Sequence, residues 1–85
     1  MKAIQVALLT PNGSVYEGEA ESVRVPGIVG SFAVLTGHAP IISPLEKGEV
    51  LITLPDRTTQ TFQIDGGVVE VLDDHVSVLA ESIIK

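Results

Sequence analysis

The feature that most constrains the fold of this chain is a period-two alternation of aliphatic residues between recurrent turn signals. Ile4, Val6 and Leu8, for example, alternate with Gln5 and Ala7. Such alternation is typical of half-buried β-strands, because successive side chains point to opposite faces of a sheet. Turn signals recur roughly every 8–12 residues, which is the spacing of an all-β sandwich or barrel. No stretch of the sequence shows a sustained helical period.

Several local signals predict where the strands turn, bend or end. The parity of the alternation changes near Glu21-Ser22, which predicts a β-bulge there. Asp65-Gly66-Gly67 and Asp73-Asp74 are each expected to connect two strands. Pro44 cannot donate to a strand ladder, so residues 41–43 are predicted to form a short strand at a sheet edge.

Chain length and composition limit the kind of core that this domain can build. The 85 residues predict a single domain spanning residues 1–85. The hydrophobic fraction is 45% but the aromatic fraction is 4%, so the core is expected to consist of Val, Ile, Leu and Ala. The chain has no cysteine, which excludes disulfides and thiolate metal sites. No apolar run reaches the ~18–20 residues that span a bilayer, and no signal peptide is recognised, so we expect no direct membrane insertion.

The charged residues argue against nucleic-acid binding. The net charge is −6, from 11 acidic and 5 basic residues. The basic residues are far apart in the sequence: Lys2, Arg24, Lys47, Arg57 and Lys85. Phosphate backbones are bound by clustered Lys and Arg, so we expect no nucleic-acid partner. Glu17, Glu19 and Glu21 alternate and are interpreted as a solvated strand face.

The residues that usually carry chemistry form no recognisable constellation. The two histidines are His38, in a loop rich in Gly and Pro, and His75, beside a predicted hairpin turn. Neither is accompanied by the partners of a metal site or a catalytic triad. The glycines form no phosphate-binding loop, because no helix follows them and no Gly-Lys-Ser/Thr step occurs. We therefore predict no catalytic residue, metal, nucleotide, cofactor or small-molecule substrate. For His38, an interface contact and a structural hydrogen bond within its loop both remain open.

Two separated motifs resemble the signatures of the epsilon subunit of F-type ATP synthases. Residues 30–45 read G-S-F-A-V-L-T-G-H-A-P-I-I-S-P-L, and Gly48 follows them. Residues 65–82 read D-G-G-V-V-E-V-L-D-D-H-V-S-V-L-A-E-S. The opening segment, which ends T-P-N-G-S-V-Y-E-G-E-A, is similar to the first hairpin of the family. The resemblance covers nearly the whole chain, with the motifs in the family's order and spacing.

The sequence also departs from the family at a few positions. Ser31, Ala33 and Thr36 stand where the family often has an acidic residue, Gly and Pro. Epsilon subunits usually carry a helical hairpin after the sandwich, and this chain stops at Lys85. In the family that hairpin can inhibit ATP hydrolysis and in some members binds ATP. We therefore expect neither epsilon-type inhibition nor a nucleotide site here.

The resemblance implies a fold, a role and partners. The fold is a single β-sandwich of two antiparallel sheets with about ten short strands. The role is that of a non-catalytic rotor subunit, which links the γ shaft to the membrane c ring and couples proton flow to ATP synthesis. Carried over from the family, the c-ring contacts are Val29, Gly30, Ser31 and Phe32. The γ contacts are Thr10, His38 and Ser43.

The resemblance also implies a location, and two other classes of protein remain as alternatives. We expect a peripheral protein at the cytoplasmic face of a bacterial cell membrane, rather than at a chloroplast thylakoid. One alternative is a free-standing β-sandwich binding module. The other is a small enzyme, for which no credible triad, metal set or phosphate loop is present. Phe32 is interpreted either as an interface anchor or as a core residue beneath its loop.

Overall fold

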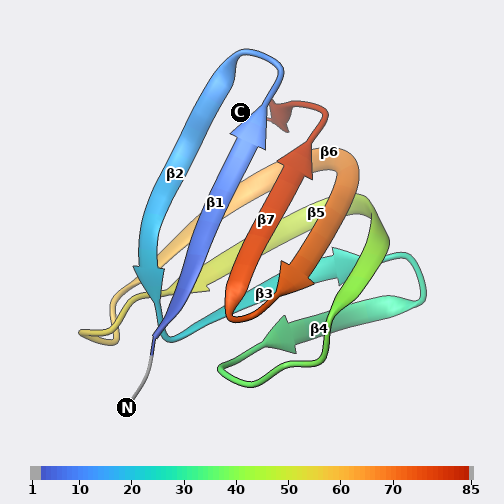
Figure 1. Cartoon of the computed structure of the whole chain (residues 1–85). Helices are drawn as coiled ribbons and strands as arrows, with labels where there is room; N and C mark the ends of the chain where they lie inside the picture. The colour runs from blue at the N-terminus through green and yellow to red at the C-terminus, as the bar shows by residue number, and fades with distance from the viewer. Residues whose placement is uncertain (1–2, 85) are drawn as a thin grey trace.

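The structure, a computed structural model that describes residues 3–84, consists of eight β-strands (Figure 1). The strands are β1 (Ile4–Thr10), β2 (Gly13–Ala20), β3 (Ser22–Gly27), β4 (Gly30–Val34), β5 (Ile41–Thr53), β6 (Thr59–Leu72), β7 (His75–Ala80) and β8 (Ile83–Ile84). The outermost ends of the predicted domain, with Lys2 and Lys85, lie outside the described residues. Among residues 3–84 there is no helix long and apolar enough to cross a membrane.

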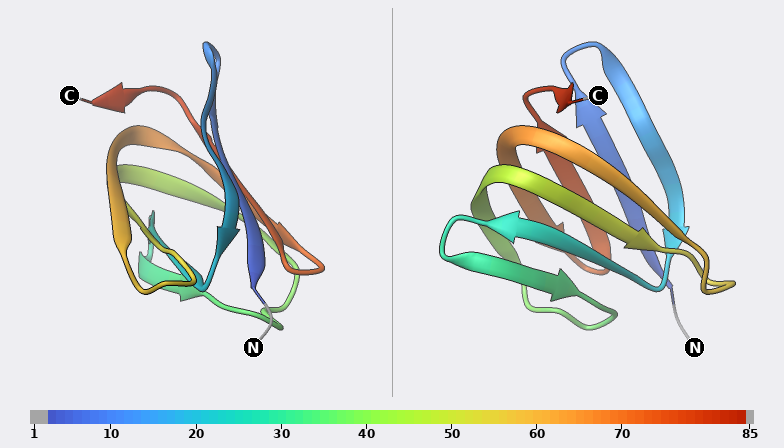
Figure 2. Two further views of the ribbon diagram at one scale, coloured as in Figure 1. Left: turned by 90° about the vertical axis from the view of Figure 1, so that its left-hand side faces the viewer. Right: turned by 180° about the vertical axis from the view of Figure 1, so that it is seen from behind.

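The strands form one continuous sheet that folds over into two layers (Figure 2). Its strand order is β2-β1-β7-β6-β5-β3-β4, and β8 pairs with β6. β5 and β6 are paired along their whole length and run through both layers. Residues 41–45 of β5 and 67–72 of β6 join β7, β1 and β2 in the first layer. The remaining halves of β5 and β6 form the second layer with β3, β4 and β8.

The all-β class predicted from the alternation is confirmed, whereas two details differ. The strands belong to one sheet instead of two, and eight strands replace the expected ten or so. The reason is that β5 and β6, with 13 and 14 residues, each take the place of two short strands. In addition, β1 and β7 are parallel. They can be parallel because the chain between them passes through the second layer and returns, as a parallel pair requires.

The glycines of β6 bend this strand instead of ending it. Asp65, Gly66 and Gly67 all lie inside β6, so the predicted turn at these residues is wrong. Gly66 has a φ of 101° and Gly67 a φ of 153°, both in a region that side chains disfavour. A Cβ on Gly67 would collide with the carbonyl oxygen of Leu79 in β7. The glycine pair thus lets the strand fold over while it stays close to its neighbour.

Two other predictions about the strands also need correction. The bulge expected at Glu21-Ser22 is instead a corner, where the chain leaves β2 in the first layer and enters β3 in the second. Parity changes there because the inward direction reverses between layers. Residues 41–43 do not form a separate short strand, because β5 continues through Pro44 to Thr53. They do lie at an edge, since within the described chain residues 41–43 pair with β6 alone.

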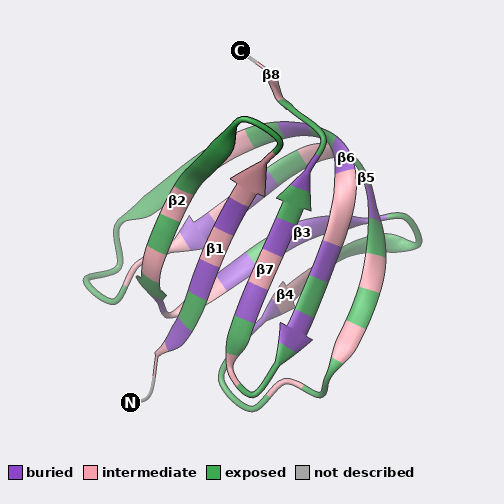
Figure 3. Ribbon diagram, turned by 45° about the horizontal axis from the view of Figure 1, so that its top comes forward, coloured by how far each residue is buried: buried purple, intermediate pink, exposed green. Residues whose placement is uncertain are grey.

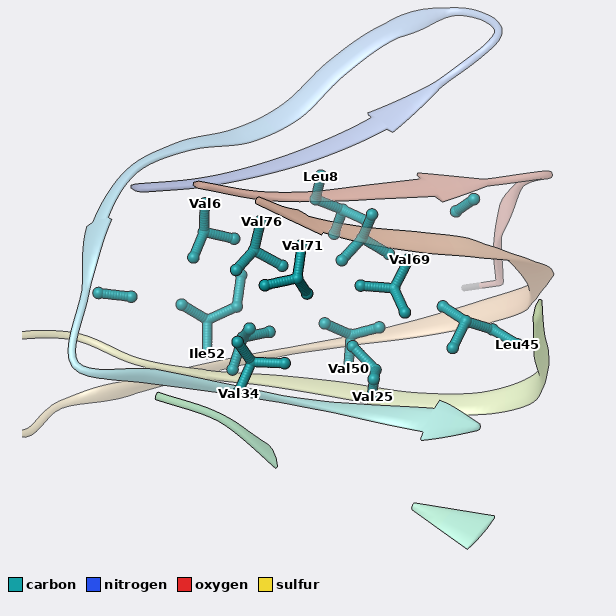
Figure 4. Close-up of a cluster of buried hydrophobic side chains, with 14 of the residues drawn as sticks. Val6, Leu8, Val25, Val34, Leu45, Val50, Ile52, Val69, Val71 and Val76 are labelled. Atoms are coloured by element: carbon teal, nitrogen blue, oxygen red, sulfur yellow. The ribbon is translucent and has the colours of Figure 1, made fainter. Parts of the chain in front are cut away.

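The core between the two layers is aliphatic, as the composition predicts (Figures 3 and 4). The buried hydrophobic residues are Ile4, Val6, Leu8, Ala20, Val23, Val25, Val34, Leu45, Val50, Ile52, Ile64, Val69, Val71, Val76, Val78 and Ala80. Within residues 3–84 no polar or charged residue is buried. β1 and β7 show the expected alternation of buried and more exposed residues, whereas β4 and the middle of β5 depart from it. The buried positions of both layers nevertheless meet in one aliphatic core.

The turn between β5 and β6 contains the carboxylate with the clearest electrostatic perturbation. The Asp56 Oδ1 atom accepts hydrogen bonds from the Thr58 hydroxyl at 2.6 Å and the Thr58 amide at 3.0 Å. The Thr58 hydroxyl and then its amide lower the pKa of Asp56 below its usual 3.8, because both favour the charged form. Since the pKa of Asp56 is lower in the folded chain, this contact stabilises the fold fully at pH values above the usual pKa of the carboxyl group. Its contribution disappears as the pH falls through the lowered pKa.

We therefore expect the Asp56 carboxylate to titrate below 3.8 in the folded chain. Thr58→Ala should move its midpoint back towards that value, because the hydroxyl donor is lost. Carboxyl chemical shifts followed by NMR during an acid titration measure this directly. Thr59→Ala, at the next residue, serves as the control and should leave the midpoint in place. An unchanged midpoint in Thr58→Ala would contradict the assignment.

Candidate functional site

The exposed aliphatic residues of the chain point to two candidate contact surfaces. The large hydrophobic side chains that are exposed are Val15, Ile28, Val29, Leu35, Ile42, Leu72 and Leu79. We call residues 28–31 the hairpin tip. We call the depression lined by Pro40, Ile41, Ile42, Glu70, Val71 and Leu72 the lateral groove. Clustered apolar surface of this kind marks interaction sites more often than isolated exposed residues do.

The hairpin tip is the turn between β3 and β4 and carries two adjacent exposed aliphatic side chains. Ile28 is 56% exposed and Val29 is completely exposed. The Ile28 amide donates to the Pro44 carbonyl at 3.4 Å, which fastens the tip to the corner of β5. Gly30, with a φ of 149°, opens β4. The tip is therefore an apolar projection from a paired hairpin, suited to contact with another molecule.

Phe32 supports this hairpin from below instead of projecting from it. Its ring is partly buried and packs against the core cluster. A Cβ on Gly27 would lie 2.9 Å from the Phe32 ring, so glycine leaves the space that the ring occupies. The ring also stacks on His38, with centroids 6.3 Å apart and planes 28° apart. Of the two interpretations of Phe32, the structure favours the core residue beneath a loop.

The lateral groove lies over the start of β5 and the end of β6, in the first layer. It is an open depression with a volume of about 540 Å³. Ile42 is 72% exposed and Leu72 is 56% exposed, and both contribute to its lining. Ile42 stands opposite Glu70 in the register of β5 and β6, so a carboxylate borders the apolar surface. The groove can accept an apolar side chain, and Glu70 favours a positively charged group beside it.

Sequence reasoning missed this groove, although the sequence contains a signal for it. Ile41-Ile42 and Val71-Leu72 are adjacent aliphatic pairs, and each places one side chain on the outward face of its strand. An apolar residue at the outward parity departs from the in-and-out alternation of a half-solvated sheet. The two pairs lie about thirty residues apart, so only the pairing of β5 with β6 shows that they form one surface.

The loop that contains His38 lies at one end of the lateral groove. The Gly37 amide donates to Asp74 Oδ1 at 2.8 Å, and this bond holds the loop to the turn between β6 and β7. The His38 amide donates to the Leu35 carbonyl at 3.2 Å. His38 Nδ1 donates to the Ala39 carbonyl at 2.7 Å, which leaves Nε2 for an external partner. The structural hydrogen bond and the interface contact weighed for His38 are thus compatible.

The predicted γ contacts do not lie in one place. His38 and Ser43 flank the groove-lining residues of β5 in the sequence, and Ser43 is half-buried. Thr10 lies at the C-terminal end of β1, which is next to the C-terminal end of β7. The loop with His38 is instead tied to the turn that precedes β7, at the opposite end of that strand. The Thr10 hydroxyl caps the first hairpin, accepting from Asn12 and donating to Gly13 at 3.2 Å each. The predicted c-ring contacts, in contrast, are contiguous in the hairpin tip and β4.

The polar side chains of the described chain are suited to solvation and contact. Residues 3–84 contain no group of three or more His, Cys, Asp or Glu that could hold a metal ion. Glu17 and Glu19 are exposed, which confirms a solvated strand face. Glu21 departs from that face and forms an ion pair with Arg57 at 3.3 Å. Because Arg57 is largely exposed, this pair contributes little to stability.

The sequence is similar to named proteins along nearly its whole length. Residues 3–85 match the family model described as ATP synthase, Delta/Epsilon chain, beta-sandwich domain. The chain is 42% identical to the ATP synthase epsilon chain of Chlorobaculum tepidum over 82 residues, which cover 96% of this chain and 93% of that relative. It is 39% identical to the ATP synthase epsilon chain of Bacillus subtilis over 82 residues, which cover 96% of this chain and 61% of that relative.

The fold is similar to that of chains in solved ATP synthase structures. One belongs to the Euglena gracilis mitochondrial ATP synthase in an assembly with the c-ring, with a TM-score of 0.90 and 18% identity. That match covers 96% of this chain and 52% of the other. Another belongs to the central stalk and c-ring of the Tetrahymena thermophila enzyme, with a TM-score of 0.81 and 16% identity. It covers 99% of this chain and 67% of the other, and at such identities the likeness is one of fold.

Proposed function

This chain belongs to the ATP synthase delta/epsilon chain family, and we propose that it serves as a non-catalytic subunit of the rotor. In this role it links the γ shaft to the c ring, so that rotation driven by proton flow reaches γ while other subunits make ATP. The observation that carries the proposal is a pair of apolar surfaces, made of different residues, on a scaffold that is built from strands throughout residues 3–84. A linker between two moving parts needs two such contacts and a rigid body between them.

The hairpin tip is the proposed contact with the c ring. Val29, Gly30 and Ser31 are exposed, and Val29 projects completely into solvent. Phe32 belongs to the same segment, and its packing supports the tip from within. An apolar tip on a paired hairpin loses little conformational entropy when it docks, which favours binding. The tip therefore combines exposed apolar area with a preformed conformation.

The loop with His38, together with the lateral groove, is the proposed contact with γ. His38 presents its Nε2 atom at one end, and Ser43 follows Ile42 along β5. Glu70 lies at the border of the apolar lining, so the partner surface is expected to place a Lys or Arg beside an apolar residue. Thr10 stands apart, and a γ contact that includes it has to extend across the first layer to the first hairpin.

The proposed location follows from the proposed partners. A subunit held between γ and a c ring is a peripheral component of a membrane-associated complex. Among bacterial relatives of this family we place it at the cytoplasmic face of the cell membrane. In this arrangement the chain reaches the membrane through the c ring, and its own strands stay outside the bilayer.

Binding of the purified chain to a γ subunit from the same source tests the proposal. We expect a one-to-one complex, and we expect His38→Ala to raise its Kd about fivefold to tenfold, as the loss of one interface contact does. Thr61→Ala, at an exposed position of the second layer, serves as the control. Phe32→Ala is unsuitable as an interface probe, because the Phe32 ring packs against the core. If correctly folded γ from the same source does not bind, the proposed function is wrong, and the free-standing binding module becomes the favoured alternative.

A further inference from the structure

Asp74 joins three segments of the chain at the end of the lateral groove. Its Oδ1 atom accepts the Gly37 amide at 2.8 Å, and its carbonyl oxygen accepts the Gln5 amide at 2.9 Å. Asp74 itself belongs to the turn between β6 and β7, with a φ of 62°. One residue thus ties the loop at 35–40, the start of β1 and the β6–β7 hairpin together.

The turn alone does not explain why an aspartate stands at position 74. Asp73 and Asp74 have φ values of 50° and 62°, as in a two-residue hairpin turn with both central residues at positive φ. Asn, Asp and Gly all suit such positions, because the turn depends on the backbone conformation. Among residues 3–84, Asp73 accepts a hydrogen bond from the His75 ring through its backbone carbonyl oxygen and not through its carboxylate. The side-chain bond to Gly37 distinguishes Asp74 from its neighbour.

The segment that Asp74 holds also has contacts of its own. Gly37 has a φ of 84°, the His38 amide donates to the Leu35 carbonyl, and the His38 ring stacks on Phe32. His38 then follows directly, and Pro40 forms part of the groove lining. The bond from Gly37 to Asp74, which spans 37 residues of sequence, joins the loop to the turn that follows Leu72. If this acceptor is lost, the Gly37 amide donates to water instead, and the loop samples more conformations.

We propose that Asp74 is a positioning residue for the γ contact, holding the His38 loop in its binding-competent position beside the lateral groove. This inference rests on the proposed function. Its physical basis is preorganisation, because a loop that is ordered before binding loses less entropy on association. The carboxylate acts as a hydrogen-bond acceptor, so its charge is dispensable while its Oδ1 atom is required.

Three variants of the whole chain separate this role from the needs of the turn. Asp74→Ala removes the acceptor, Asp74→Asn keeps Oδ1, and Asp73→Ala removes the same charge from the same turn. The first measurement is hydrogen exchange at the Gly37 amide by NMR. We expect exchange at least about tenfold faster in Asp74→Ala, and near the wild-type rate in the other two variants. Faster exchange in Asp73→Ala as well would overturn the inference, because general loosening of the turn would then explain it.

The second measurement is the affinity of each variant for γ. Asp74→Ala should raise the Kd about fivefold to tenfold, while Asp74→Asn and Asp73→Ala stay close to wild type. If wild type binds γ and Asp74→Ala binds equally well, the positioning role is wrong and the proposed function stands. If wild type does not bind γ, the proposed function fails together with the positioning role at that contact. The exchange of Gly37 then still reports whether Asp74 anchors the loop.

Discussion

Replacing Gly67 by alanine should destabilise the folded chain by about 3 kcal/mol or more, the largest effect that we expect from a single methyl group. The new Cβ would meet the Leu79 carbonyl oxygen, and it would lie 3.0 Å from the Ala80 Cα. Both neighbours are backbone atoms of β7, paired with β6, so they can move away only if the ladder opens. The φ of 153° adds conformational strain for any residue with a side chain.

Gly30→Ala is the matched control for this prediction. Gly30 has nearly the same φ, 149°, but a Cβ there would meet nothing within 4 Å. The free energy of unfolding of Gly30→Ala should therefore fall by about 1 kcal/mol, from the backbone conformation alone. Urea unfolding followed by circular dichroism gives both free energies of unfolding, provided that the slope of unfolding free energy against urea stays constant. Equal losses in the two variants would show that the contact with β7 is unimportant.

Replacing Ile42 by aspartate should weaken binding to γ at least about 30-fold, equivalent to ~2 kcal/mol. Ile42 is 72% exposed at the edge of the sheet, so a polar residue there should leave the fold intact. The new carboxylate would sit opposite Glu70 and place two negative charges beside the apolar lining. Titration calorimetry with purified γ measures the affinity, and the thermal unfolding temperature checks the fold.

Val29→Asp supplies the reciprocal control, because it introduces the same charge at the other surface. Val29 is completely exposed at the hairpin tip and is not part of the lining of the lateral groove. We expect it to leave the affinity for γ unchanged and to weaken association with isolated c rings. Ile42→Asp should have the opposite pattern. If both variants impair the same partner, the assignment of one surface to each partner is wrong.

Local sequence patterns predicted the strands and the core well and the bend in β6 poorly. Alternation identified the strands around Val50, Ile52 and Val76, and those residues are buried as expected. Asp73-Asp74 was predicted as a turn and is one. Asp65-Gly66-Gly67 was predicted as a turn by the same reasoning and lies inside a strand. Glycines at positive φ serve both purposes, and the approach of β7, which is distant in sequence, decides between them.

The candidate site, too, was predicted from the sequence only in part. The family motifs pointed to the hairpin tip and to the loop with His38, because both depend on short contiguous segments. The lateral groove required the register in which Ile42 lies opposite Glu70. The place of Thr10, far from the other two predicted γ contacts, required the parallel pairing of β1 with β7. Neither of these two strand pairings can be predicted from a short stretch of sequence.

The sequence by itself therefore determined the all-β class, the aliphatic core, most turns and the family. These properties follow from side-chain alternation and turn chemistry, which act between residues close together in the chain. Only the tertiary structure decided that one sheet forms both layers, that the lateral groove forms between β5 and β6, and that Asp74 holds Gly37 across 37 residues. Contacts between distant segments depend on strand register and packing, which many sequences with the same alternation can satisfy in different ways.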